Sequence, residues 1–123
     1  MRILTTFASI LTLAMGLSAG TAHAGNTLKL KQFGFGNAFG AHQAGNGNYL
    51  SAAQNGNGNS TAAHQHGDGN VLGVGQFGSN HTTNVTQNGN GNVMGVLAVG
   101  NGCNQSATQT GNNGVGMSVC AGF

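Results

Sequence analysis

Hydrophobic and polar residues alternate in seven-residue segments along most of the chain. The segment from Asn26 to Gln32 reads Asn-Thr-Leu-Lys-Leu-Lys-Gln, and the pattern returns from Asn37 to Gln43. A period of two predicts a β-strand, because successive side chains of a strand point to opposite faces. One face carries Leu, Phe, Ala, Val, Thr or Met, and we expect it to point inward. The other face is expected to look outward and carries Lys29, Lys31, His42, Tyr49, Ser51, His64 and Thr82.

These segments recur every eleven residues without an insertion. The column that ends them holds Gln32, Gln43, Gln54, Gln65, Gln76, Gln87, Ala98, Gln109 and Cys120. Two residues later there is always glycine: Gly34, Gly45, Gly56, Gly67, Gly78, Gly89, Gly100, Gly111 and Gly122. The column that begins them holds Asn26, Asn37, Asn48, Asn59, Asn70, His81, Asn92, Cys103 and Gly114. A fixed period over this many copies predicts a stack of equivalent units.

Four-residue links join the segments, as in Ala-Gly-Asn-Gly at 44–47. The second link residue is glycine and the fourth is glycine or asparagine, the residue types that adopt positive φ at low cost. The links therefore predict β-arcs, with each strand stacking in parallel on the copy 22 residues away. A meander of two-residue hairpins is the structural alternative.

These features predict an all-β, two-sided β-solenoid of nine strands, two per turn, which stacks into cross-β fibrils. Each turn should add about 4.8 Å of height. Leu28, Leu50, Leu72 and Met94 in one sheet should face the smaller Ala41, Ala63, Val85 and Ala107 in the other. The inward Asn and Gln side chains should hydrogen-bond to identical residues above and below, as amide ladders do. The alternative is that they are ordinary polar loop residues.

Residues 1–24 have the form of a secretory signal peptide. Arg2 precedes an apolar run, and Ala22-His23-Ala24 has the small-x-small pattern of a cleavage site. The alternative is an uncleaved membrane anchor, for which the run is short and interrupted by threonine and serine. We expect cleavage after Ala24, leaving a single domain from residue 25 to residue 123 with no membrane span.

The fixed charges after Ala24 are Lys29, Lys31 and Asp68. This near neutrality argues against a nucleic-acid footprint. One carboxylate, without a basic partner or nucleophile placed around it, argues against an enzyme, and no cofactor is expected. Composition alone would favour a disordered Gly/Asn/Gln-rich segment, but the strict period argues for order once strand edges are paired.

The repeats have the form Asn-x-ψ-x-ψ-x-Gln-x-Gly-x-Gly-Asn, where ψ is an inward small or apolar residue, and cover Asn26 to Cys120. They resemble the repeats of the curlin proteins, the secreted bacterial subunits of curli amyloid fibres. The resemblance implies export through an outer-membrane secretion pore, polymerisation outside the cell started by a nucleator subunit, and a role in biofilm matrix and surface adhesion. Two features depart from the family pattern. The first strand follows Gly25 at once, without a Gly-rich export stretch, and the pair of cysteines is not required by the pattern.

Cys103 begins one segment and Cys120 ends the next. Consecutive strands of a two-strand turn cross the core in opposite directions, so these two positions face each other. We therefore predict a disulfide between them, with free thiols or an intermolecular bond as alternatives. Ala98 should lie beside His81 by the same geometry.

His42 and His64 share an outward column in adjacent turns, and His66 lies just beyond. They are weak candidates for a Zn²⁺ or Cu²⁺ site, and simple solvation of exposed histidines is the preferred interpretation.

The unprotected first and last strands favour head-to-tail self-association, which does not close and so makes filaments. We expect a fibre subunit, with a nucleator-type minor subunit as the alternative. From another class, a secreted solenoid that binds ice or a polysaccharide would need a flat array of identical residues. The outward Thr82, Thr86 and Thr108 are too sparse for one.

Overall fold

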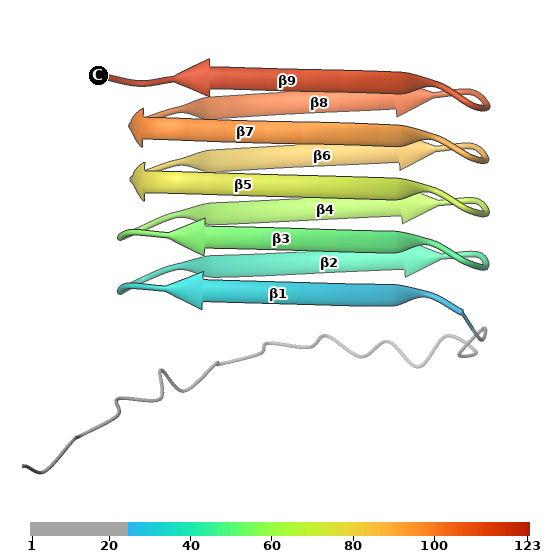
Figure 1. Ribbon diagram of the computed structural model, residues 1–123, viewed down its shortest axis with the longest axis horizontal. Helices are drawn as coiled ribbons and strands as arrows, with labels where there is room; N and C mark the ends of the chain where they lie inside the picture. Colours follow the sequence, from blue (N-terminus) through green and yellow to red (C-terminus); the bar gives the residue numbers. More distant parts are fainter. Residues whose placement is uncertain (1–24) are drawn as a thin grey trace, which may run out of the picture.

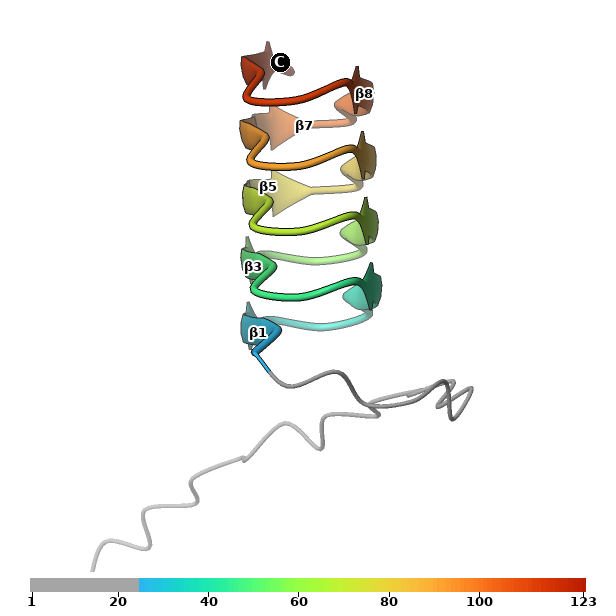
Figure 2. The ribbon, with the colours of Figure 1, turned by 90° about the vertical axis from the view of Figure 1, so that its right-hand side faces the viewer.

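A computed structural model describes residues 25–123, and the predicted signal peptide at 1–24 lies outside the described residues. The nine strands within residues 25–123 are β1 (Thr27–Phe33), β2 (Ala38–Ala44), β3 (Tyr49–Asn55), β4 (Ser60–His66), β5 (Val71–Ser79), β6 (Thr82–Asn88), β7 (Val93–Asn101), β8 (Asn104–Thr110) and β9 (Val115–Ala121). They alternate between two facing sheets, one with the order β1-β3-β5-β7-β9 and the other with the order β2-β4-β6-β8 (Figure 1). We call these the five-stranded and the four-stranded sheet. Figure 2 shows the chain passing from one sheet to the other and back as it climbs.

Every strand pair is parallel and joins residues 22 apart, as Leu50↔Leu72 in the five-stranded sheet and Gln65↔Gln87 in the four-stranded sheet illustrate. This confirms the predicted β-solenoid and excludes the hairpin meander for residues 25–123. β5 and β7 are nine residues long rather than seven. They are longer because the arc residues Phe77–Ser79 pair in register with Val99–Asn101.

The arcs have the positive φ angles that the glycine spacing predicts. At Gly56 φ is +131°, and an added Cβ would overlap the carbonyl oxygen of Gly78 in the next turn. Asparagine takes the fourth arc position at Asn80 and Asn113, with φ of 59° and 56°. The second arc position therefore needs glycine for two reasons, backbone conformation and space, whereas the fourth needs only a residue that tolerates positive φ.

The core is a narrow strip between the two sheets. Leu50 and Leu72 are fully buried, and Ala63 and Val85 pack in the same cluster, as the predicted pairing of large with small columns requires. Leu28 occupies the same column as Leu50 but is 42% exposed, because β1 is the first strand of its sheet. Among residues 25–123 there is no helix long and apolar enough to cross a membrane.

Candidate functional site: the ladders along the two edges

The Asn and Gln columns follow the two narrow edges of the solenoid. We name the edge where odd strands lead into even strands the odd-to-even edge; it lies on the left in Figure 1 and contains the arcs 33–36, 55–58, 77–80 and 99–102. The opposite one, with the arcs 44–47, 66–69, 88–91 and 110–113, is the even-to-odd edge. Each edge carries one Asn column and one Gln column.

The Gln side chains form ladders, each donating its amide to the glutamine one turn later. On the even-to-odd edge the ladder has three steps, from Gln43 to Gln65 (2.8 Å), Gln87 (2.9 Å) and Gln109 (3.1 Å). On the odd-to-even edge it runs from Gln32 to Gln54 (2.6 Å) and Gln76 (2.8 Å) and then stops. The second amide hydrogen goes to a carbonyl of the facing sheet, as Gln65 Nε2 to Tyr49 O at 3.1 Å. Internal glutamines are thus buried with their polar atoms paired, which removes the cost of burying them.

The Asn columns are held differently from the prediction, because they pair with the backbone rather than with one another's amides. Asn48 Oδ1 accepts the backbone N–H of Asn70 at 3.0 Å. Its Nδ2 donates to Gly67 O at 2.8 Å and to Ala44 O at 3.1 Å. The asparagine amide therefore pins successive arcs together through their main chain.

A third polar column, in the third arc position, was missed by the sequence reasoning. Asp68 Oδ1 accepts the N–H of Asn46 at 2.8 Å, and Asn90 Oδ1 accepts that of Asp68 at 2.8 Å. Asn57 accepts the N–H of Phe35 in the same way at 3.1 Å. The recurrent Asn between the two arc glycines was the available signal. Asp68 therefore has a structural role like that of its Asn neighbours.

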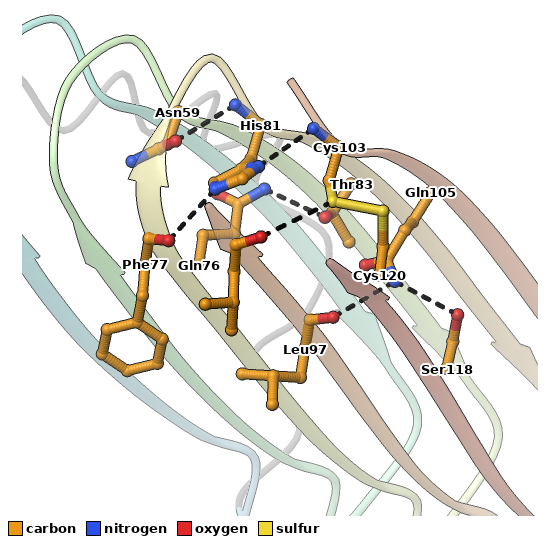
Figure 3. Close-up of a disulfide and its surroundings, with 11 residues drawn as sticks. Asn59, Gln76, Phe77, His81, Thr83, Leu97, Cys103, Gln105, Ser118 and Cys120 are labelled. Carbon is orange, nitrogen blue, oxygen red and sulfur yellow. Dashed lines mark hydrogen bonds between the residues drawn. A yellow bond between two sulfur atoms is a disulfide. The ribbon is translucent and has the colours of Figure 1, made fainter. Parts of the chain in front are cut away.

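In the third turn of the odd-to-even edge, His81 replaces asparagine and makes the same kinds of bond (Figure 3). Its N–H donates to Asn59 Oδ1 at 3.1 Å, and its Nδ1 accepts the N–H of Cys103 at 3.1 Å. Because Nδ1 accepts, Nε2 carries the proton and donates to Phe77 O at 3.2 Å. The imidazole reproduces both halves of the asparagine amide while fully buried.

Further along this edge a covalent bond takes the place of the amides. Cys103 and Cys120 form a disulfide with a Cα–Cα distance of 6.0 Å, and Cys103 is buried. Ala98, fully buried, lies between Gln76 and Cys120 in the Gln column. His81 and Ala98 are 17 residues apart, the same separation as the two cysteines, so they are the equivalent pair one turn earlier.

The missing glutamine at Ala98 is matched by a larger residue in the facing sheet. Thr61 Oγ1 bridges Gln54 and Gln76, at 3.1 Å and 3.0 Å. Gln105 stands in the same column as Thr61, and its Nε2 donates to Leu97 O at 3.2 Å and to Ser118 Oγ at 3.4 Å (Figure 3). Its Oε1 is buried and, among residues 25–123, is the one such side-chain atom without a hydrogen-bond partner.

The outer faces of the two sheets differ in polarity. The outer face of β4, β6 and β8 carries mostly polar residues, as expected, whereas that of β2 carries Ala38, Gly40, His42 and Ala44. The outer face of β5, β7 and β9 is instead apolar: its exposed residues include Val71, Phe77, Val93, Leu97, Val99, Val115, Met117 and Val119. The expectation of a polar outward face is wrong for these three strands, since an exposed apolar column alternates in the same way as a polar one.

The histidine candidates do not form a three-ligand site. The rings of His42 and His64 lie side by side with centroids 6.2 Å apart, while His66 aligns with Ala44 and Asn88 in another column. Within residues 25–123, no three His, Cys, Asp or Glu side chains come together in a way that could hold a metal ion.

The fold and its edges define a class: a parallel β-solenoid whose turns are joined by ladders of inward amides. Residues 56–89 match the family model of the curlin associated repeat. This match supports the resemblance to the curlin repeats that the sequence pattern indicates. No curated protein and no solved structure matches the chain.

Proposed function

We propose that the chain is a secreted structural subunit that self-assembles head-to-tail into extracellular curli-type amyloid fibres. In this role it contributes to biofilm matrix and surface adhesion, crosses the outer membrane through a secretion pore, and begins to polymerise on a nucleator subunit. The match of residues 56–89 to the curlin associated repeat supports this proposal, because curlin proteins are secreted subunits of such fibres.

The observation that carries the proposal is the state of the two ends of the solenoid. β1 and β2 at one end, and β8 and β9 at the other, each have one neighbour in their sheet and leave the other edge of the strand uncovered (Figure 1). Unpaired strand edges without proline and with few charges are templates for further pairing. The two ends differ from each other, so the contact between them is heterologous and extends without closing.

The ends are also complementary in hydrogen bonding. Each internal glutamine accepts from the previous turn and donates to the next. Within the chain, Gln109 Oε1 accepts from Gln87, which leaves its Nε2 as the donor for a further turn. Gln32, at the opposite end, donates to Gln54 and keeps its Oε1 as an acceptor. A donor at one end and an acceptor at the other let the ladder continue into a second copy.

Fibre diffraction and seeding on purified residues 25–123 test the proposal, because every strand, ladder and disulfide described above lies within this range. We expect diffraction reflections at about 4.7 Å and 10 Å. We also expect preformed fibres to accelerate growth. A chain that stays monomeric at neutral pH would contradict autonomous assembly.

A matched pair of variants tests whether β1 is a surface on which the fibre grows. Leu28→Lys puts a charge on the inward, half-exposed position of β1, which a second copy would bury, and we expect it to suppress growth. Thr27→Lys adds the same charge to the neighbouring outward position and should leave growth close to that of the parent. Equal growth of the two variants would show that β1 is not a growth surface.

A further inference from the structure

The two ends of the solenoid are out of step by half a turn. Within residues 25–123 one sheet has five strands and the other has four. β9 therefore lies half a turn beyond β8 along the axis (Figure 2), and the next free place in the stack is on β8, in the four-stranded sheet. The strand that a second copy offers first is β1, which belongs to the five-stranded sheet of its own copy.

We infer that successive copies stack with a half-turn rotation about the fibre axis, so that β1 of each copy lies on β8 of the previous one and β2 lies on β9. This rests on the proposed head-to-tail assembly and specifies its contact. Without rotation, placing β1 on β9 leaves a gap of one strand above β8. Placing β2 on β8 without rotation instead puts β1 where β9 already is. The rotated arrangement fills both sheets at the normal strand spacing of about 4.8 Å.

The inward columns fit this contact. Continuing the 22-residue register places Gln32 of the next copy on Gln109, so the donor Nε2 meets the acceptor Oε1 and the ladder of the even-to-odd edge goes on. It also places Phe39 of the next copy over Gly116, where the absence of a side chain leaves room for the ring. The rotated contact places Gln43 over the disulfide-bonded Cys120 and the unrotated contact places Gln32 there, so only the rotated contact continues a glutamine ladder from one copy to the next.

The outward columns fit it as well. In the rotated contact Lys29 and Lys31 of the next copy lie beside Ser106 and Thr108, which are polar and exposed. In the unrotated contact the same two lysines would lie beside Met117 and Val119, the exposed apolar residues of β9. Rotation instead sets Ala38, Gly40 and His42 of the next copy against Val115, Met117 and Val119. Both lysines then lie beside polar residues, and two of the three exposed apolar residues of β9 lie beside Ala38 and Gly40, which favours the half-turn on grounds independent of the strand count.

Cysteine pairs distinguish the two contacts. Lys31→Cys with Thr108→Cys places thiols in one outward column across the rotated contact, and Lys31→Cys with Val119→Cys does so across the unrotated contact. Neighbouring strands bring the Cα atoms to about 4.8 Å, within the range that a disulfide spans. The paired positions lie at opposite ends of a chain, so each bond can form only between copies. Lys31→Cys alone is the control, because one thiol per copy cannot link more than two chains.

The experiment is mild oxidation of assembled fibres, followed by denaturing electrophoresis without reductant and peptide mapping. We expect the Lys31/Thr108 pair to lose its monomer band to a ladder of covalent oligomers, while the Lys31/Val119 pair stays at the level of the control. Oligomers from Lys31/Val119, or from neither pair in fibres that grow normally, would overturn the rotation and leave the proposed assembly standing. A failure of all chains, the parent included, to form fibres would overturn both.

A measurement on the unaltered chain gives a second test. Rotated copies advance by four and a half turns, about 22 Å, and unrotated copies by five turns, about 24 Å. The mass per length of a single fibre is therefore about a tenth higher in the rotated packing than in the unrotated one. Scanning transmission electron microscopy of unstained fibres measures this quantity, and a value at the lower figure would contradict the half-turn.

Discussion

The two edges of the solenoid are built from the same repeat yet are held together by different chemistry. Each turn of the even-to-odd edge pairs an asparagine with a glutamine 17 residues later, from Asn26 and Gln43 up to Asn92 and Gln109. The odd-to-even edge starts in the same way. Its third pair is His81 with Ala98, and its fourth is the Cys103–Cys120 disulfide.

The difference shows what the repeat requires at these positions. The Asn column must satisfy the backbone N–H of the next turn, and an imidazole nitrogen does so as well as an amide oxygen. The Gln column must fill buried space without leaving an unpaired polar atom, which a methyl group or a sulfur also achieves. Identity of residue is therefore less constrained than hydrogen-bond role and volume.

The largest effect we predict is at the arc glycines, where the two edges should behave alike. Gly67→Ala on one edge and Gly78→Ala on the other each place a Cβ onto the carbonyl oxygen of the next arc, at φ of 114° and 123°. We expect each to cost at least about 3 kcal/mol and to prevent folding at the altered turn. Urea denaturation and fibre yield measure the loss.

The control is Gly69→Ala, where φ is +66° and nothing lies within 4 Å of the added Cβ. Its cost should be about 1 kcal/mol, from backbone strain alone. If Gly69→Ala proved as harmful as Gly67→Ala, the overlap with the next arc would not be the reason for the glycine.

Breaking an internal ladder should be the next largest effect. Gln65→Leu removes bonds to Gln43, Gln87 and Tyr49 O and leaves buried polar atoms without partners. Since an unsatisfied buried group costs about 1–3 kcal/mol, we expect a loss of about 3 kcal/mol. The loss should be the same with and without reductant, because this edge has no disulfide. His64→Ala, an exposed outward neighbour, should change the free energy of unfolding by less than about 0.5 kcal/mol.

Loss of the Cys103–Cys120 disulfide should destabilise only the odd-to-even edge. The double variant Cys103→Ser with Cys120→Ser opens a loop of 17 residues, and we expect a loss of about 3 kcal/mol that is confined to β8 and β9. Hydrogen exchange resolved by strand is the measurement. Cys103→Asn with Cys120→Gln, which restores the residues of the other edge, should lose less. A uniform loss of protection across all nine strands would contradict a local role for the disulfide.

Most of the fold could be predicted from the sequence because the eleven-residue period fixes register, strand spacing and arc position together. The same period also predicts that Cys103 and Cys120 face each other. Three features did not follow. Whether an asparagine amide bonds to its neighbour's amide or to the backbone depends on which arc N–H and C=O groups lie beside it, which no pattern of residue types reports. The role of Asp68 depends on arc geometry, and the apolar outer face of β5, β7 and β9 alternates just as a polar one does.

The smallest effect we predict is also the one that tests the edge comparison most closely. His81→Asn keeps the hydrogen-bond roles but leaves unfilled space, and Ala98→Gln forces an amide against the imidazole, so each alone should cost about 1–2 kcal/mol. In a Gln105→Thr background, which restores the smaller residue that faces the other glutamines of this edge, the two changes together rebuild the amide pair of the even-to-odd edge, because the introduced glutamine side chain is placed to accept from Gln76 as Gln76 accepts from Gln54. The double variant should therefore recover at least about 1 kcal/mol relative to the sum of the singles.

Urea denaturation midpoints of the four proteins complete the cycle. The control is Asn70→His, the same exchange in reverse on the intact edge. Additive losses would mean that His81 and Ala98 vary independently, and that the odd-to-even edge is not a matched substitute for the amide ladder.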